Sequence, residues 1–187
     1  MANKTTEGLR ADARRNRARV LEVAAEVFAT EGLSVPVHEI ARRAGVGTGT
    51  VSRHFPAKED LFAAILLGRM EQLTAEADTL ASSCDPGPAF FALFAALVRE
   101  GAAHRGLAEA LAGAGYDLDG AAVRAGYDVT GRLRDLLARA QRAGAVRPEI
   151  NDADVKALLA GCLARDGDGA ALDRMVAVVC DGLRPPG

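Results

Sequence analysis

The sequence has no tryptophan, and aromatic residues make up only 4% of its 187 residues, although hydrophobic residues make up 49%. Its apolar content is therefore mostly alanine, leucine and valine, and alanine and leucine are the strongest helix formers. Turn signals do not recur at the spacing of about eight to twelve residues that a β-sandwich needs. The composition predicts an all-α protein, with one or two domains by its length.

Cysteines, long apolar runs and catalytic motifs are also scarce. Cys84, Cys162 and Cys180 are too few and too scattered for a disulfide framework or a zinc site. The longest uncharged run, 86–98, has 13 residues, fewer than the roughly 18 of a membrane span. The polar N-terminus does not resemble a signal peptide, and no nucleophile or metal-protease motif is present. We expect a soluble cytoplasmic protein with no enzymatic activity, metal or cofactor.

The formal net charge of −2 argues against a nucleic-acid partner, but this value averages two unlike segments. Residues 1–55 hold nine basic and six acidic side chains, a net charge of +3, and the remaining residues carry −5. Such asymmetry indicates a nucleic-acid-facing end on an acidic body.

Residues 37–55, VHEIARRAGVGTGTVSRHF, fit a helix-turn-helix, the motif whose second helix enters the DNA major groove. Ala41 is small where the two helices would cross, and Gly45 supplies the positive φ of the tight turn. Val51 would face inward. The side chains expected to be exposed on the second helix are short or basic and suit phosphates and base edges: Thr48, Gly49, Thr50, Ser52, Arg53 and His54.

Residues 14–62 resemble the DNA-binding domain of the TetR family of bacterial transcriptional regulators. The resemblance rests on 20–32, on IARRAGV at 40–46 and above all on GTVSRHFPAKEDL at 49–61. It covers about a quarter of the chain. Ser52 stands where the family usually has a tyrosine that contacts phosphate, which changes the expected contact geometry but not the fold.

The resemblance implies a role for each matching residue. Thr50, His54 and Lys58 would bind phosphates, Lys58 from the start of a helix whose free N–H groups favour anions. Thr48 and Arg53 are the candidates for base contact. The complete predicted DNA-binding set is Arg14, Arg17, Val37, Thr48, Gly49, Thr50, Ser52, Arg53, His54 and Lys58. Taken alone, Arg14 and Arg17 could equally form a solvated helix face.

We therefore predict a flexible arm over 1–9, a three-helix DNA-binding domain over 10–57 and a helical ligand-binding and dimerisation domain over 58–187, with about nine helices in total. The first helix is expected from Arg10 to Thr30 and the second from Pro36 to Ala44. Seven glycines between 101 and 131 leave the helix boundaries there open. They fit either a pliable segment or close helix packing.

The last two predicted helices carry apolar stripes that either belong to the chain's own core or mediate dimerisation, as the final two helices of the family do. The predicted interface comprises Val155, Leu158, Leu159, Cys162, Leu172, Met175, Val176 and Val179. The predicted ligand pocket, whose members are hard to separate from ordinary core, comprises Phe62, Ile65, Phe90, Phe91, Phe94, Leu97, His104, Tyr116 and Tyr127.

The resulting hypothesis is a homodimeric regulator that binds a palindromic operator in double-stranded DNA and is released by a small-molecule effector. Repression by ligand release comes from the resemblance alone. The alternatives are a transcriptional activator, a nonspecific chromosome-binding protein, and a helical ligand-binding protein in which Ser52 marks weakened DNA binding.

Overall fold

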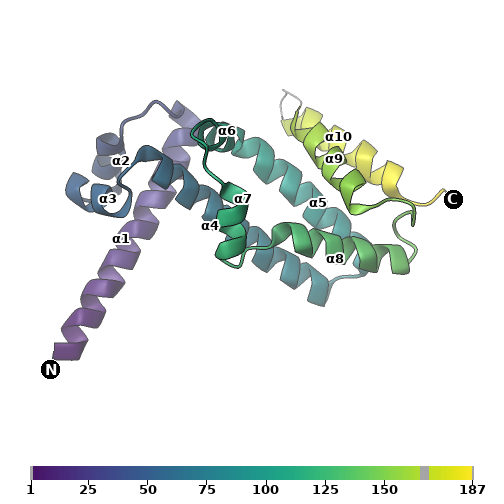
Figure 1. Cartoon of the computed structure of the whole chain (residues 1–187), viewed down its shortest axis with the longest axis horizontal. Coiled ribbons are helices and arrows are strands. Elements are labelled where there is room, and N and C mark those ends of the chain that lie inside the picture. Colours follow the sequence, from purple (N-terminus) through teal and green to yellow (C-terminus); the bar gives the residue numbers. More distant parts are fainter. Residues whose placement is uncertain (1, 165–168, 187) are drawn as a thin grey trace. The chain divides into compact units, whose positions relative to one another are not determined.

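The computed structural model describes residues 2–164 and 169–186, and this part of the chain contains ten α-helices and no strand (Figure 1). The prediction of an all-α protein is therefore confirmed. In chain order the helices are α1 (Ala2–Glu31), α2 (Val37–Ala44), α3 (Thr48–His54), α4 (Lys58–Ser83), α5 (Pro86–Ala103), α6 (Arg105–Gly113), α7 (Leu118–Arg124), α8 (Val129–Arg142), α9 (Asp152–Leu163) and α10 (Gly169–Leu183).

The ends of several helices differ from those expected. The arm predicted over 1–9 is helical from Ala2 onward and continuous with α1, which therefore begins earlier than the expected Arg10. The glycine-rich segment holds two short helices, α6 and α7. A capping box opens α9, because the side chains of Asn151 and Asp154 each accept the other's backbone N–H.

The helices form two compact units, one of residues 1–67 with 106–118 and the other of 68–105 with 119–187. This division differs from the boundary expected between 57 and 58. The first turns of α4 belong to the first unit because Leu61, Phe62, Ile65 and Leu66 are buried in its core.

No described helix is both long and apolar enough to span a membrane.

The core of the first unit holds α3 in place. Val51 of α3 and Ile40 of α2 are fully buried, and both belong to the same apolar cluster as Phe28 of α1. The rings of Phe28 and Phe62 meet edge to face, with centroids 5.0 Å apart, an arrangement that stabilises aromatic pairs beyond simple burial. The helix that presents side chains to solvent is therefore anchored to both α1 and α4.

The turn between α2 and α3 depends on Gly45. Its φ of 68° lies in the left-handed region, which glycine enters without the steric cost that a Cβ imposes. The Val46 N–H donates to the Ala41 carbonyl at 3.0 Å and so closes the end of α2. This confirms the positive φ expected at that position.

The second unit is built around α5, which packs against α8, α9 and α10 (Figure 1). Phe90, Leu93, Phe94 and Val98 of α5 have no exposed surface. A Cβ at Gly101 would lie 2.8 Å from a methyl carbon of Leu163. At this position the glycine therefore serves the close helix packing that the sequence left as one of two alternatives.

Candidate nucleic-acid interface

The surface of α3 carries the polar side chains expected there. Thr48, Ser52, Arg53 and His54 are exposed, as is Gly49, and Thr50 is half-buried. Val37, which opens α2, is half-buried against the core of the first unit. Val51 and Phe55 face inward on the same segment, and Gly49 and Arg53, each two positions from Val51, lie on the opposite side of the helix.

Arg53 is folded back along its own helix. Its Nε donates to the Gly49 carbonyl at 2.9 Å, which directs the guanidinium toward the N-terminal part of α3. In helix-turn-helix proteins the N-terminal residues of the second helix contact base edges. With Nε engaged, the two terminal nitrogens of Arg53 are the donors available for the paired hydrogen bonds that an arginine makes to guanine.

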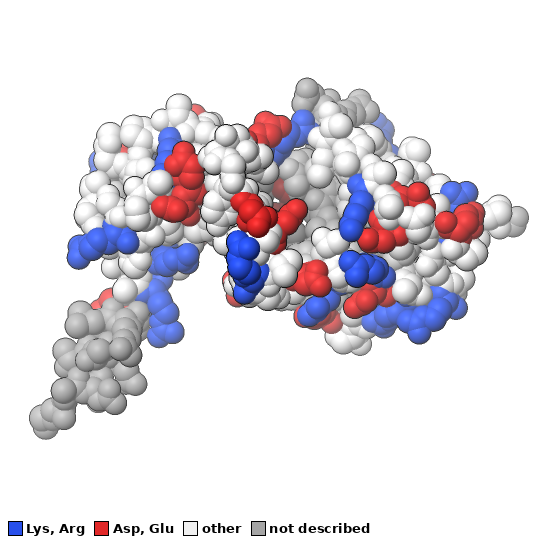
Figure 2. Space-filling view, in the orientation of Figure 1, with Lys and Arg blue, Asp and Glu red and all other residues white. Residues whose placement is uncertain are grey.

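Two arginines predicted on α1 are exposed, and one of them lies against the helix-turn-helix. The Arg17 guanidinium sits 5.4 Å from the centroid of the Phe55 ring, within the range of a cation–π contact. Arg14, one turn earlier, is also exposed. Figure 2 shows basic side chains along the edge of the first unit formed by α3 and the adjoining part of α1.

The arginines of the ARRA segment, in contrast, are engaged within the protein. Arg42 binds both carboxylate oxygens of Glu39, at 2.7 and 2.6 Å, and Arg43 Nε donates to Glu39 at 2.8 Å. Arg43 also pairs with Glu31 at the end of α1. These hydrogen bonds lower the pKa of Glu39 from its ordinary 4.5 to about 2 and also lower that of Glu31.

We call Glu31, Glu39, Arg42 and Arg43 the α1–α2 charge cluster. This cluster was not predicted, because the net charge of residues 1–55 counts both arginines toward a basic surface. The spacing of Glu39 to Arg42 and Arg43, three and four residues, is the usual one for ion pairs on a helix and could have revealed three of its four members. The pair between Glu31 and Arg43 joins residues of two helices and has no local signal.

Lys58 begins α4 and is half-buried. Its ammonium nitrogen lies 5.6 Å and 5.9 Å from the ring centroids of Phe28 and Phe62. The Ala57 N–H at the start of this helix donates to Asp60 at 2.8 Å, so a neighbouring carboxylate already uses one of the donors expected to favour an anion. A phosphate bound by Lys58 would have to attract the ammonium away from the two rings.

The predicted pocket residues do not all belong to one unit. Phe62 and Ile65 are buried in the core of the first unit, to which Tyr116 also belongs. Phe90 and Phe94 are fully buried in the second. The remaining four, all in the second unit and half-buried, are Phe91, Leu97, His104 and Tyr127.

Two of these residues have specific contacts. Phe91 lines a surface cavity of about 630 Å³ with Arg184, whose guanidinium lies 4.5 Å from the ring centroid. His104 Nδ1 lies 3.4 Å from a carboxylate oxygen of Glu100. A role in ligand binding stays a prediction for all nine.

The predicted dimer residues divide by burial. Val155, Cys162 and Val176 are buried inside the second unit, where they contribute to its own core. The other five are only partly buried there: Leu158, Leu159, Leu172, Met175 and Val179. Val178, which is not among the predicted interface residues, is 72% exposed. A single exposed valine is ordinary on a protein surface, so the candidate contact surface rests on the five partly buried residues.

The fold and the exposed second helix define a helix-turn-helix protein, and comparisons with known proteins agree. The family model described as bacterial regulatory proteins of the tetR family matches residues 20–65, and the model of the SbtR-like transcriptional regulator C-terminal domain matches residues 85–185. The chain belongs to the TetR family of bacterial transcriptional regulators.

Individual relatives support the same conclusion. A TetR transcription regulatory protein from Mycobacterium vanbaalenii is 49% identical, with 95% of this chain and 99% of that chain covered and a TM-score of 0.74. A TetR regulator from Streptomyces coelicolor is 31% identical, covering 91% and 99% at a TM-score of 0.73. An HTH-type transcriptional regulator from Staphylococcus aureus is 43% identical over 54 residues, which are 28% of this chain and 29% of that relative.

Proposed function

We propose that this protein is a homodimeric repressor that binds a palindromic DNA operator and leaves it when a small molecule binds the second unit. The observation that carries the proposal is the outer face of α3, where polar side chains and Arg53 are exposed beside Arg17 of α1. A protein that acts on DNA in this way works in the cytoplasm of a bacterium.

The division of charge in the first unit supports this proposal. The acids Glu31 and Glu39 pair with the arginines of α2 and so offset two basic groups there. Arg14, Arg17 and Arg53 take part in no ion pair among the described residues. The positive charge available to DNA is therefore concentrated along α3 and the adjoining turns of α1, where a duplex would lie.

The dimer is proposed because two recognition helices, related by a two-fold axis, read two half-sites about one helical turn of DNA apart. The partly buried apolar residues of α9 and α10, together with Val178, form the proposed contact surface. Val155, Cys162 and Val176 are excluded from it because the protomer's own core covers them.

Ligand release requires a molecule that binds one arrangement of the dimer more tightly than the DNA-bound arrangement. The half-buried Phe91, Leu97, His104 and Tyr127 of the second unit combine apolar and polar groups, the mixture typical of small-molecule sites. A partly apolar effector with a few hydrogen-bonding groups is the class that fits.

Footprinting across the region upstream of the gene tests the proposal. A discrete protected palindrome is expected, and diffuse or absent protection would instead favour nonspecific DNA binding or a ligand-binding protein without an operator. Sedimentation at micromolar concentration should give a dimer. A thermal-shift screen of small metabolites then identifies effectors, each of which must release the protein from the operator and thereby raise transcription.

A further inference from the structure

The first turns of α1 extend beyond the core of the first unit. Figure 1 shows the N-terminal part of this helix leading away from α2 and α3. Among the described side chains of α1, Val20 is the first to join the core, and of residues 12–19 only Ala13 is even half-buried. At 1.5 Å per residue, the helix before Val20 is about 27 Å long. We call residues 12–19 the exposed turns of α1. They add nothing to the core and leave their surface to a partner.

The exposed turns of α1 carry the positive charge of the N-terminal region. Four arginines and one acid, Asp12, give them a net charge of +3, which equals the net charge of the whole stretch 1–55. The arginines are Arg14, Arg15, Arg17 and Arg19. Arg15 pairs with Asp12, and the other three have no ion-pair partner within the described part of the chain. Two pairs of these arginines stand three or four positions apart, where like charges repel on a helix. A polyanion lying alongside would relieve this repulsion.

One face of the exposed turns lies on the side of α3. Arg14 and Arg17 are three positions apart and therefore share a face of α1. The Arg17 guanidinium lies 5.4 Å from the centroid of the Phe55 ring, at the C-terminal end of α3. Arg15 is about 100° further round the helix than Arg14 and is engaged by Asp12. The face of Arg14 and Arg17 thus continues the surface that α3 presents, away from the core.

We propose that the exposed turns of α1 bind the phosphate backbone of DNA outside the half-site that α3 reads, through the face of Arg14 and Arg17. The inference rests on the proposed operator binding and adds a second contact on each flank of the palindrome. Each DNA strand carries a phosphate about every 3.4 Å, so the helix before Val20 matches about eight base pairs in length. Because phosphate contacts carry no sequence information, the flank needs no particular sequence.

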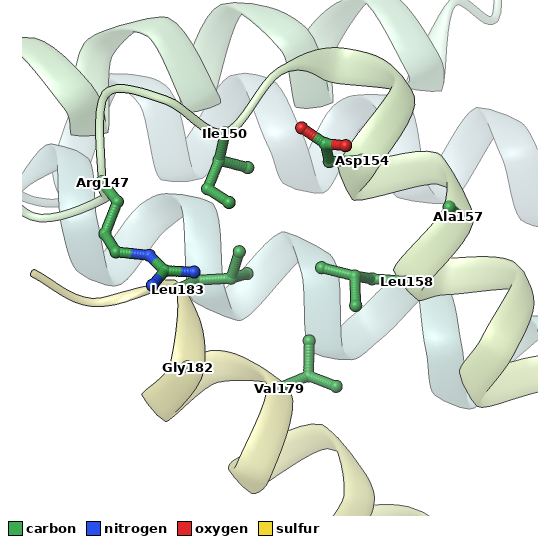
Figure 3. A pocket seen from close by; sticks show the side chains of 8 residues that line it. All are labelled: Arg147, Ile150, Asp154, Ala157, Leu158, Val179, Gly182 and Leu183. Atoms are coloured by element: carbon green, nitrogen blue, oxygen red, sulfur yellow. The ribbon is translucent and has the colours of Figure 1, made fainter.

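The composition of the exposed turns favours DNA over a protein partner. The proposed dimer surface, in contrast, has an apolar groove of about 390 Å³ between α9 and α10, across which Leu158 and Val179 face each other (Figure 3). Residues 12–19 have no apolar side chain larger than alanine, so they cannot supply the apolar core that a protein interface needs. A basic stripe along a helix without such a core is the electrostatic footprint of a nucleic-acid contact.

The test compares the full chain on two labelled operator duplexes by fluorescence anisotropy. The palindrome found by footprinting is synthesised once so that it ends at its last base pair, and once with about eight base pairs of random sequence on each side. One flank contact per protomer should make the slope of log affinity against log salt steeper by about 1.8 on the extended duplex. Between 50 and 200 mM salt, binding to the extended duplex should therefore weaken about ten times more than binding to the trimmed one.

Two variants decide whether the difference between the duplexes comes from a placed contact, since a longer duplex attracts any cationic surface more strongly. Arg14→Gln should remove the difference. Arg15→Gln is the matched control, because it removes the same charge from the adjacent exposed position, which Asp12 engages, and it should keep the full difference. Arginine and glutamine have similar helix propensities, so circular dichroism should show an intact α1 in both. A hydroxyl-radical footprint should lose its outermost protected positions with Arg14→Gln only.

The outcomes separate this inference from the proposed function. A protein that protects no palindrome would overturn both. A palindrome bound with the same salt slope on the two duplexes would overturn the flank contact and leave operator binding intact. An equal loss of the difference in Arg14→Gln and Arg15→Gln would also overturn it, because it would show that α1 acts through its net charge and not through one face.

Discussion

The α1–α2 charge cluster leads to a prediction about how DNA binding depends on salt. Each phosphate contact contributes about 0.9 to the slope of log affinity against log salt. Arg17 lies beside the helix-turn-helix with no ion-pair partner among the described residues, whereas Arg42 is neutralised by Glu39. Arg17→Gln, which removes one contact per protomer, should reduce the slope of a dimer by about 1.8, while Arg42→Gln should leave it unchanged.

The difference is large enough to measure by fluorescence anisotropy with labelled operator DNA. Between 50 and 200 mM salt, a slope difference of about 1.8 makes the unmodified protein lose about ten times more affinity than Arg17→Gln. The two variants are matched, since each replaces an exposed arginine of the first unit. An equal loss of slope in Arg42→Gln would refute the reasoning, because it would mean that the pair with Glu39 opens on DNA.

Three further predictions concern the first unit. Arg53→Ala should weaken specific operator binding by about 1–3 kcal/mol and binding to random DNA much less; an equal loss on both, in the same anisotropy assay, would reduce Arg53 to a phosphate contact. Glu39→Gln should lower the melting temperature at pH 7. Because the pKa of Glu39 in the folded protein, about 2, lies below its ordinary 4.5, the difference in melting temperature from the unmodified protein should vanish as the pH falls from 4.5 toward 2. A pH-independent difference would contradict this assignment. Urea unfolding should show that Gly45→Ala, at a φ of 68°, destabilises the protein by about 1–2 kcal/mol. Gly49→Ala, with open space at its Cβ position, should instead stabilise it by about 0.5–1 kcal/mol. Stabilisation by both substitutions would argue against strain at Gly45.

Much of the DNA-facing site could be predicted because its signals are local. The turn required a glycine at 45, and the alternation of buried and exposed positions around Val51 follows from helical periodicity. The limits of α1 were missed because polar residues 2–9 lack apolar periodicity, although they continue its helix. The boundary of the first unit was missed because 106–118 returns to it from far along the chain.

The predicted ligand and dimer residues were harder to place for the same reason. An apolar stripe indicates which side chains share a helix face, but it does not indicate what covers that face. Cys162 and Leu158 both lie on the stripe of α9, yet Cys162 is fully buried in the protomer's core and Leu158 lines an open groove. Similarly, Phe62 and Phe90 were assigned to one pocket, and they belong to the cores of different units.

The sequence by itself determined the helical class, the position of the helix-turn-helix and the family to which they point, since these depend on residues close together in the chain. Only the tertiary structure decided which charges and apolar groups remain available to a partner. Arg43 is neutralised by Glu31 twelve positions away, whereas Arg14 is exposed on α1 with no ion-pair partner among the described residues. Availability depends on the neighbours that folding brings into contact, and periodicity along one helix carries no record of them.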